Sequence, residues 1–248
     1  MKKLLALYSR PTLLALAAVV TAAPAGALLI GIGHRAARAA DLQAPLPPPA
    51  VDEPLARRSG SETAILSGGC FWGMQLVFQH VKGVRAVLAG YTGGAAQTAH
   101  YGDVSTGTTG HAESIEITFD PHVVSYGTLL RIYFSVATDP TELDYQGPDE
   151  GSQYRGAIWP MNDTQRHIAA AYLGQLAAAH VFRAPIVTRI DEARPFYPAE
   201  SYHQNFATRH PYYPYIVMFD APKAAALARM FPRLYLARAT LVMAAVRP

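Results

Sequence analysis

The 248-residue sequence contains one cysteine, Cys70, and its neighbours are those expected around a reactive thiol. Gly68 and Gly69 precede it, and apolar residues at helical spacing follow it, which predicts a position between a strand and a helix. Free N–H groups at a helix N-terminus favour thiolate, so the pKa of this thiol is expected to fall below about 8.5. A lone cysteine can also be a small buried apolar side chain, but the glycines and adjacent aromatic residues favour a nucleophile.

Candidate partners of this thiol are one carboxyl and two histidines. Glu113 and His111 lie where a long polar loop enters an alternating strand. If burial raises the pKa of Glu113, its carboxyl can donate a proton at neutral pH; otherwise it is an ordinary exposed strand-end residue. His111 or His203 acting as a base toward Cys70 would instead make a thiol acyl hydrolase. His111 and Glu113 also suggest a zinc deaminase, which is rejected because its P-C-x-x-C motif is absent.

Hydrophobic periodicity predicts strands alternating with helices. Strands are expected over residues 63–67, 84–91, 115–119, 153–159 and 185–190, and helices over 70–83, 125–134 and 163–179. Three long loops, over residues 92–109, 139–151 and 195–215, are expected to carry functional groups. This order predicts an α/β (α+β) two-layer sandwich in which flanking helices cover a mixed, ferredoxin-like sheet.

Composition and charge divide the chain into four parts. Half of the residues are hydrophobic and 16% are charged, which excludes a disordered protein. The formal charge of +3 arises largely from residues 1–40, so no nucleic-acid partner is expected. Residues 1–40 are expected to be a signal peptide or a membrane anchor, with a possible tether over residues 11–33, and the protein is expected to be periplasmic or on the outer face of the inner membrane. Residues 41–62 are expected to be a proline-rich linker, 63–220 a catalytic domain and 221–248 a basic tail.

Four blocks of residues occur in a specific order along the chain. They are Gly68-Gly69-Cys70-Phe71-Trp72-Gly73, Gly90-Tyr91-Thr92-Gly93-Gly94, Thr109-Gly110-His111-Ala112-Glu113 and Gln146-Gly147-Pro148-Asp149-Glu150-Gly151-Ser152-Gln153-Tyr154-Arg155. Phe196-Tyr197-Pro198-Ala199-Glu200 and Tyr202-His203-Gln204 continue the pattern. Over about residues 63–219 the chain resembles the A-type peptide methionine sulfoxide reductases.

The resemblance implies a thiol-dependent reduction of the S epimer of methionine sulfoxide, free or in oxidised proteins. Cys70 would attack the substrate sulfur and end as a sulfenic acid, and Glu113 would protonate the sulfoxide oxygen. The resemblance implies further catalytic roles for Tyr101, Tyr154 and Asp149, and substrate-binding roles for Phe71, Trp72, Gly69 and His203. The aromatic pair would form an apolar wall for the S-methyl group, and the tyrosines would hydrogen-bond the oxygen.

The chain departs from the family pattern in its recycling chemistry. Many members use a second cysteine to resolve the sulfenic acid, whereas this sequence has only Cys70. An external thiol, from a thioredoxin-like protein or a small molecule, is therefore expected as reductant, with no metal or organic cofactor, and the chain is expected to be a monomer. Ser105 stands where some relatives carry cysteine, and Thr138 where histidine is common. A non-catalytic binding module for oxidised methionine is the remaining alternative.

Overall fold

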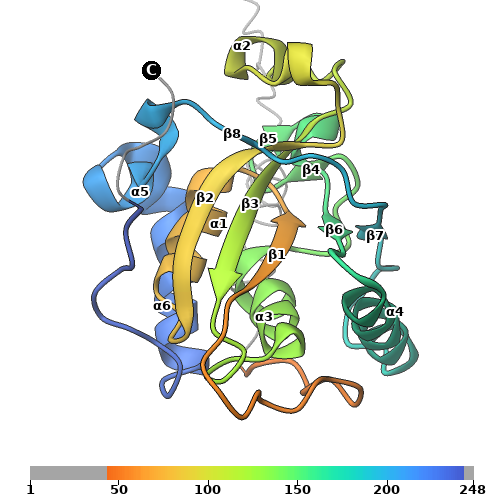
Figure 1. Ribbon diagram of the computed structural model, residues 1–248. Coiled ribbons are helices and arrows are strands. Elements are labelled where there is room, and N and C mark those ends of the chain that lie inside the picture. Colours follow the sequence, from red (N-terminus) through yellow and green to blue (C-terminus); the bar gives the residue numbers. More distant parts are fainter. Residues whose placement is uncertain (1–43, 243–248) are drawn as a thin grey trace, which may run out of the picture. The chain divides into compact units, whose positions relative to one another are not determined.

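The computed structural model describes residues 44–242, and a six-stranded sheet is its centre (Figure 1). The strand order is β7-β6-β1-β3-β2-β8. The strands are β1 (Glu62–Ser67), β2 (Val84–Thr92), β3 (Ala112–Phe119), β6 (Ala157–Trp159), β7 (Arg189–Ile190) and β8 (Tyr197–Pro198). A separate hairpin pairs β4 (Tyr145–Gln146) with β5 (Asp149–Glu150).

The four central strands have the ferredoxin-like arrangement expected from the sequence. Strand β1 pairs antiparallel with both β3 and β6, and β2 pairs antiparallel with β3. The chain order is β1, α1 (Phe71–Gln79), β2, β3, α3 (Tyr126–Ile132) and β6, which is a split βαβ arrangement. Strand β7 runs parallel to β6, so the sheet is mixed, as predicted.

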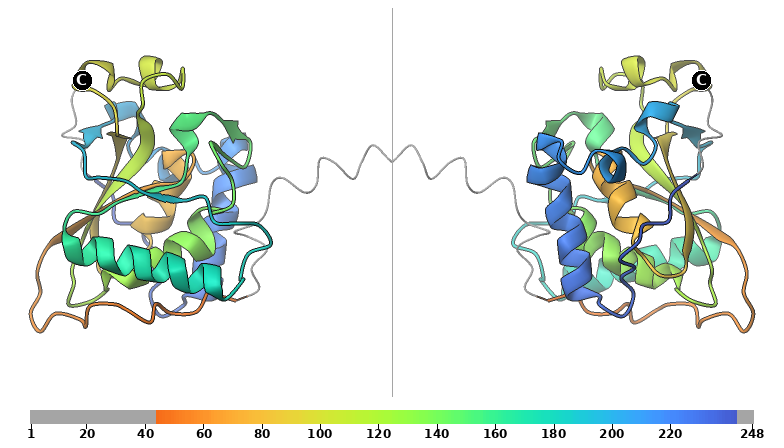
Figure 2. Two further views of the ribbon diagram at one scale, coloured as in Figure 1. Left: turned by 90° about the vertical axis from the view of Figure 1, so that its right-hand side faces the viewer. Right: turned by 90° about the vertical axis from the view of Figure 1, so that its left-hand side faces the viewer.

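One face of the sheet is covered by α1, α3 and α6 (Ala221–Met230), as Figures 1 and 2 show. Alternation along β3 directs Ile115, Ile117 and Phe119 into the core on this face, and all three are fully buried. Helix α4 (Asp163–Ala178) packs beside α3 and buries the expected stripe of Ile168 and Leu176. A smaller cluster, made of Ile65, Ala112, Ala157 and Trp159, is separate from this main core.

The structure confirms the predicted starts of α3 and α4, because a side chain caps the N-terminus of each helix. The Ser125 side chain accepts a hydrogen bond from the Thr128 N–H at the start of α3, at 3.2 Å. The Asn162 side chain accepts one from the Gln165 N–H at the start of α4, at 2.8 Å. These contacts satisfy N–H groups that have no partner within the helix.

Several boundaries differ from the prediction. Helix α1 ends at Gln79 rather than near Gly83, and Val81 instead forms an isolated β-bridge with Tyr235. The strand expected over 153–159 begins only at Ala157, because residues 152–154 form a 3-10 turn. The strand expected over 185–190 is reduced to β7. Two of the long loops also contain short helices: α2 (Tyr101–Val104) in the first, and α5 (Phe206–Arg209) in the third.

The described part of the expected proline-rich linker is packed on the body. Leu46 is only 4% exposed and belongs to the main core. Its N–H donates to Ser135 Oγ at 3.1 Å, and its carbonyl accepts from Arg131 Nε at 2.6 Å. Proline keeps this segment extended, but an extended chain can still bury one leucine and satisfy its backbone groups.

The C-terminal segment is also attached to the body as far as residue 242. Helix α6 buries Ala226, Leu227 and Met230, and the Thr240 N–H donates to the Gln79 carbonyl at 2.8 Å. A π-helical turn (Ile216–Asp220) runs directly into α6, so the helix continues across the expected tail boundary at residue 220.

The expected signal peptide or anchor over residues 1–40 lies outside the described residues. Within residues 44–242, no helix has the length and apolar character needed to span a bilayer.

Candidate active site

Cys70 lies at the N-cap of α1, the position expected from the sequence, and is partly exposed. The turn before it depends on Gly69, whose φ of +88° is strained for any other residue. A Cβ on Gly69 would also lie 2.5 Å from Gln146 Cγ. The Gly69 N–H donates to the Tyr154 carbonyl at 3.1 Å, which joins the cysteine turn to a second segment of the site.

Glu113 is buried. This decides between the two alternatives from the sequence, a buried proton donor or an exposed strand-end residue. It lies on β3 in register with Ile115 and Ile117, so its side chain faces the helices and is 2% exposed. The Phe71 N–H, in the first turn of α1, donates to Glu113 Oε2 at 3.0 Å. Burial raises the pKa of Glu113 to about 8, which this hydrogen bond opposes. The carboxyl is therefore mainly protonated at neutral pH, as a proton donor must be.

The expectation of a lowered thiol pKa is wrong for the resting site. Burial raises the pKa of Cys70 well above its ordinary value, and the carboxyls of Glu113, Asp220 and Asp149 raise it further when they are ionised. A backbone hydrogen bond from Trp72 opposes this increase but does not reverse it. The helix N-terminus supplies one favourable contribution, whereas desolvation and nearby carboxyls act in the opposite direction.

Two tyrosines reach this site from separate loops. Tyr101 begins α2, where its N–H donates to Glu200 Oε1 at 2.9 Å; Glu200 Oε2 accepts from the Tyr91 hydroxyl at 2.8 Å. Tyr154 ends a 3-10 turn (Ser152–Tyr154). Burial raises the pKa of Tyr101 to about 12 and that of Tyr154 further, so both keep the O–H that a hydrogen-bond donor requires.

The aromatic residues after Cys70 differ in exposure. Phe71 is 1% exposed and packs its ring 4.9 Å from the His203 ring, whereas Trp72 is half-buried and stacks on Phe206 at 3.9 Å. His203 accepts a hydrogen bond from the Trp72 indole N–H at 3.2 Å. Burial lowers the pKa of His203 to about 4, so it is a neutral part of this aromatic cluster.

Two acidic side chains converge on the polar side of the site, and the sequence reasoning identified only one of them. Asp149 on β5 accepts a hydrogen bond from the Tyr215 hydroxyl. Asp220, at the start of α6, is fully buried, and Lys223 Nζ lies 3.9 Å from its Oδ1. Burial raises the pKa of Asp220 to about 6. A Cβ on Gly73 would lie 2.1 Å from Asp220 Oδ1, so glycine at this position of α1 permits the carboxyl to approach.

Asp220 and Tyr215 have no recognisable sequence signal as site residues. Their place follows from the packing of α6 and the preceding turn on α1. The one available clue was a single aspartate before Ala-Pro-Lys, a combination that also occurs at ordinary helix starts.

Three other residues indicated by the sequence, His111, Ser105 and Thr138, lie outside the group of side chains around Cys70. The ring of His111 is buried, with Nε2 2.9 Å from the Ala95 carbonyl and Nδ1 accepting from the Gly94 N–H, so both ring nitrogens have backbone partners. Ser105 is exposed at the end of α2. Thr138 packs against Gly68, whose added Cβ would lie 2.9 Å from Thr138 Oγ1. Among the described residues, no group of three or more His, Cys, Asp or Glu side chains could hold a metal.

Comparison with known proteins decides the family. A family model described as peptide methionine sulfoxide reductase matches residues 62–233. The chain belongs to this family. A relative from Mesorhizobium japonicum, peptide methionine sulfoxide reductase MsrA 2, is 59% identical over 75% of this chain and 95% of its own. Another MsrA 2, from Synechocystis, is 48% identical over 72% of this chain and 84% of its own.

Solved structures agree with this assignment. Methionine sulfoxide reductase A of Corynebacterium diphtheriae is 31% identical with a TM-score of 0.52, and the match covers 64% of this chain and 80% of that one. Reduced Mxr1 from Saccharomyces cerevisiae, at 24% identity and a TM-score of 0.55 over 64% of this chain and 94% of that one, shares the fold. The chain is thus an enzyme, a peptide-methionine (S)-S-oxide reductase that uses thiols to reduce methionine sulfoxide. The acyl hydrolase and the non-catalytic module are therefore wrong.

Asp220→Asn is expected to lower the pKa of Cys70, because the substitution removes a negative charge that opposes thiolate formation. At pH 7 the wild-type carboxyl is mostly ionised, since its pKa is about 6. The measurement is the pH dependence of the rate at which iodoacetamide alkylates the only thiol. Asp163→Asn, an exposed change at the start of α4, is the control. An unchanged Cys70 titration in Asp220→Asn would contradict the assigned coupling.

Proposed function

We propose that the reductase transfers the oxygen of a methionine S-sulfoxide to the sulfur of Cys70. The observation that supports this proposal is the hydrogen bond to Glu113 from the N–H of Phe71, the residue next to Cys70, together with the raised pKa of that buried carboxyl. A sulfoxide needs such a proton donor, because its weakly basic oxygen must gain a proton before the S–O bond can break.

In the reductive half-reaction, Cys70 Sγ attacks the substrate sulfur and loses its proton. Glu113 donates a proton to the sulfoxide oxygen. The hydroxyl then passes from the substrate sulfur to Sγ as the S–O bond and the transient bond between the two sulfurs break, the thioether leaves, and the proton lost by the thiol returns to Glu113. In net terms one thiol and one sulfoxide give one thioether and one sulfenic acid on Cys70, so the substrate sulfur is reduced by two electrons and the cysteine sulfur is oxidised by two. Because the resting thiol is mostly protonated, substrate binding must accompany or precede its ionisation.

Substrate selectivity is assigned to donors around the oxygen and to aromatic surface around the methyl group. The hydroxyls of Tyr101 and Tyr154 remain protonated and can donate to the oxygen, and Trp72 offers apolar area. Burying one methyl group contributes only about 0.8 kcal/mol, so the polar contacts must supply most of the discrimination. The thioether product leaves those donors unpaired, which favours its release.

Recycling requires a thiol from outside the chain, because the sequence holds one cysteine. An incoming thiol displaces water from the sulfenic acid and forms a mixed disulfide with Cys70. A second thiol then releases Cys70 and leaves as part of a disulfide. A thioredoxin-like protein or a small thiol fits this chemistry, and oxidised proteins or free methionine sulfoxide are the substrates.

A single-turnover reaction tests the proposal. Reduced protein is mixed with each separate sulfoxide epimer and no reductant, and the methionine formed is counted by mass spectrometry. We expect one methionine per Cys70 from the S epimer and none from the R epimer. A sulfenic acid should appear on Cys70 only after the S epimer is added. Reduction of both epimers would contradict the selectivity. Two methionines per chain would require a second two-electron oxidation, and would contradict the sulfenic acid as the end state of Cys70.

The proposal includes export, so that the enzyme repairs oxidised proteins outside the cytoplasm. This part rests on the first 40 residues. Lys2 and Lys3 precede a stretch without charged residues from Pro11 to Gly33, which is a pattern typical of exported proteins. We expect the protein in the periplasmic or membrane fraction, with a mature N-terminus after Ala39 or Ala40 if the segment is cleaved. Cell fractionation followed by mass spectrometry of the intact protein is the measurement. Recovery only from the cytoplasm, with Met1 retained, would contradict it.

A further inference from the structure

A cavity of about 360 Å³ outside the catalytic group is lined by three arginines. They are Arg155, which follows the 3-10 turn of Tyr154, Arg189 on β7 and Arg194 before β8. Trp159 forms part of the wall, and its indole N–H donates to Ser67 Oγ at 2.8 Å. None of these side chains takes part in the sulfoxide chemistry, so the cavity needs a separate explanation.

Arg155 is a buried cation that contacts no counterion within residues 44–242. It is 8% exposed, and its hydrogen-bond acceptors are the backbone carbonyls of Gly110, His111 and Ser152, at 2.8 to 3.1 Å. Its Nε is buried and has no hydrogen-bond partner among the described residues. A buried N–H without an acceptor is costly, and a buried charge is normally paired.

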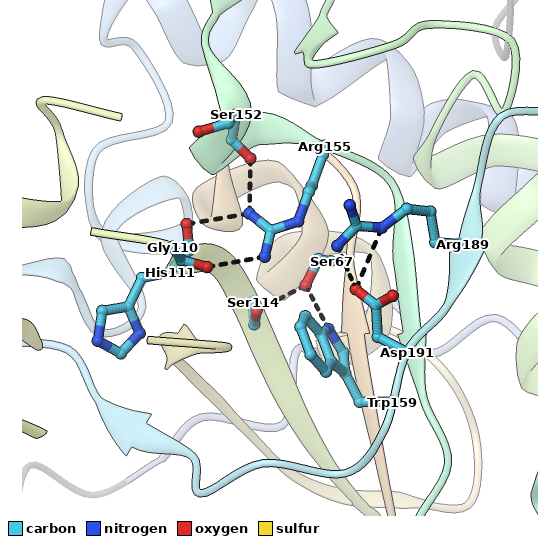
Figure 3. A network of polar contacts seen from close by, with 9 residues as sticks. All are labelled: Ser67, Gly110, His111, Ser114, Ser152, Arg155, Trp159, Arg189 and Asp191. Atoms are coloured by element: carbon cyan, nitrogen blue, oxygen red, sulfur yellow. Dashed lines mark hydrogen bonds and ion pairs between the residues drawn. The ribbon is translucent and has the colours of Figure 1, made fainter. Parts of the chain in front are cut away.

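Arg155 and Arg189 both line this cavity, and their guanidinium groups are neighbours in the view of Figure 3. The Nε edge of Arg155 is directed toward Arg189, whose own guanidinium is held by Asp191 at 2.5 Å. Burial, and then the charge of Arg189, lower the pKa of Arg155. Two guanidinium groups that repel each other across a cavity would be stabilised by an anion between them.

We infer that this cavity binds a small oxyanion, a phosphate, sulfate or carboxylate group, between the guanidinium groups of Arg155 and Arg189. The oxyanion accepts from Arg155 Nε, and the side chain of Arg194 at the rim adds positive charge. Two carboxyls, Asp191 and Glu192, also line the cavity and oppose a bound anion. Asp191 is paired with Arg189 and Glu192 is exposed, so three cations exceed the opposing charge.

This site is linked to the catalytic segments through one side chain. The Nη groups of Arg155 hold the carbonyls of Gly110 and His111, just before Glu113, and that of Ser152, two residues before Tyr154. An oxyanion bound at Nε therefore contacts the same guanidinium group whose Nη atoms join these two segments. The inference does not depend on the proposed reaction, because its test measures binding alone.

The test is thermal unfolding and calorimetric titration of the reduced enzyme with sodium phosphate, sulfate or acetate, each compared with sodium chloride at equal ionic strength. We expect saturable stabilisation by at least one oxyanion beyond that given by chloride. Phosphate or sulfate acting more strongly would assign a tetrahedral ligand, and acetate a carboxylate. Equal stabilisation by chloride would overturn the inference.

Substitutions in the cavity wall locate the effect. Arg189→Gln is expected to weaken oxyanion binding by about tenfold or more, and Arg194→Ala by less. Asp191→Asn is expected to strengthen it, because it removes the competing carboxylate from Arg189. Arg58→Ala, an exposed change outside the cavity, should leave it unchanged. Unaltered affinity in folded Arg189→Gln, or weaker binding in Asp191→Asn, would overturn the assignment.

Discussion

Glu113→Gln is expected to reduce the single-turnover rate by about 10²- to 10⁴-fold, the usual contribution of a positioned general acid. Glutamine preserves the shape of the side chain and can still accept the hydrogen bond that the Phe71 N–H donates at 3.0 Å. It has no acidic proton to give to the sulfoxide oxygen. Rapid-quench measurement of methionine formed from the S epimer is the direct assay.

The pH profile separates loss of the proton donor from general damage. The pKa of Glu113 is raised to about 8, so the wild-type rate should fall as pH rises through that value, and the variant should lack this decrease. Glu116→Gln, on the same strand but on the opposite face from Glu113, is the matched control. A Glu113→Gln rate within about threefold of wild type would exclude the carboxyl as the acid.

The same carboxyl has an expected effect on stability. Because its pKa in the folded protein lies above the ordinary value, its favourable contribution is complete at low pH and is lost as pH rises through about 8. This loss extends over the interval between the ordinary pKa of 4.5 and the folded value of about 8. The glutamine variant cannot ionise, so it should lose less stability than wild type across this interval. Urea unfolding at pH 5 and pH 9 is the measurement, and an equal loss in both proteins would contradict a buried ionising Glu113.

Elements with long, regular patterns were predictable from the sequence, and short ones were not. Strand β3 alternates Ile115, Ile117 and Phe119 with polar residues, and its bounds differ from the prediction by only a few residues at one end. Strand β8 has two residues, too few to show any period, and β7 keeps only the last two residues of the strand predicted over 185–190. These strands form because the tertiary fold brings their backbone next to an edge strand of the sheet, and local sequence patterns do not predict such pairing.

The same limit applies to the site. Register alone could have settled the burial of Glu113, since a residue two positions before Ile115 faces the same core. The direction in which the pKa of Cys70 shifts could not be obtained from strand register. It depends on Asp149 and Asp220, which hairpin β4–β5 and α6 bring to Cys70 from about 80 and 150 residues further along the chain.

Cys70→Ser is expected to abolish turnover, with a loss of at least about 10⁴-fold, comparable to removal of other covalent nucleophiles. A serine hydroxyl is far less acidic than a thiol, and no sulfenic acid can form on it. Glu113, Tyr101 and Tyr154 remain, so the variant should still bind the S-sulfoxide.

Calorimetric titration with each epimer therefore distinguishes binding from chemistry in this variant. We expect affinity for the S-sulfoxide to stay within about tenfold of the wild-type KM, since the donors that recognise the oxygen are intact. Methionine, the thioether product, lacks the oxygen and should bind more weakly because the tyrosine hydroxyls are then left unpaired. Residual reduction by Cys70→Ser would require another reductant in the chain, and the sequence contains no second thiol to supply it.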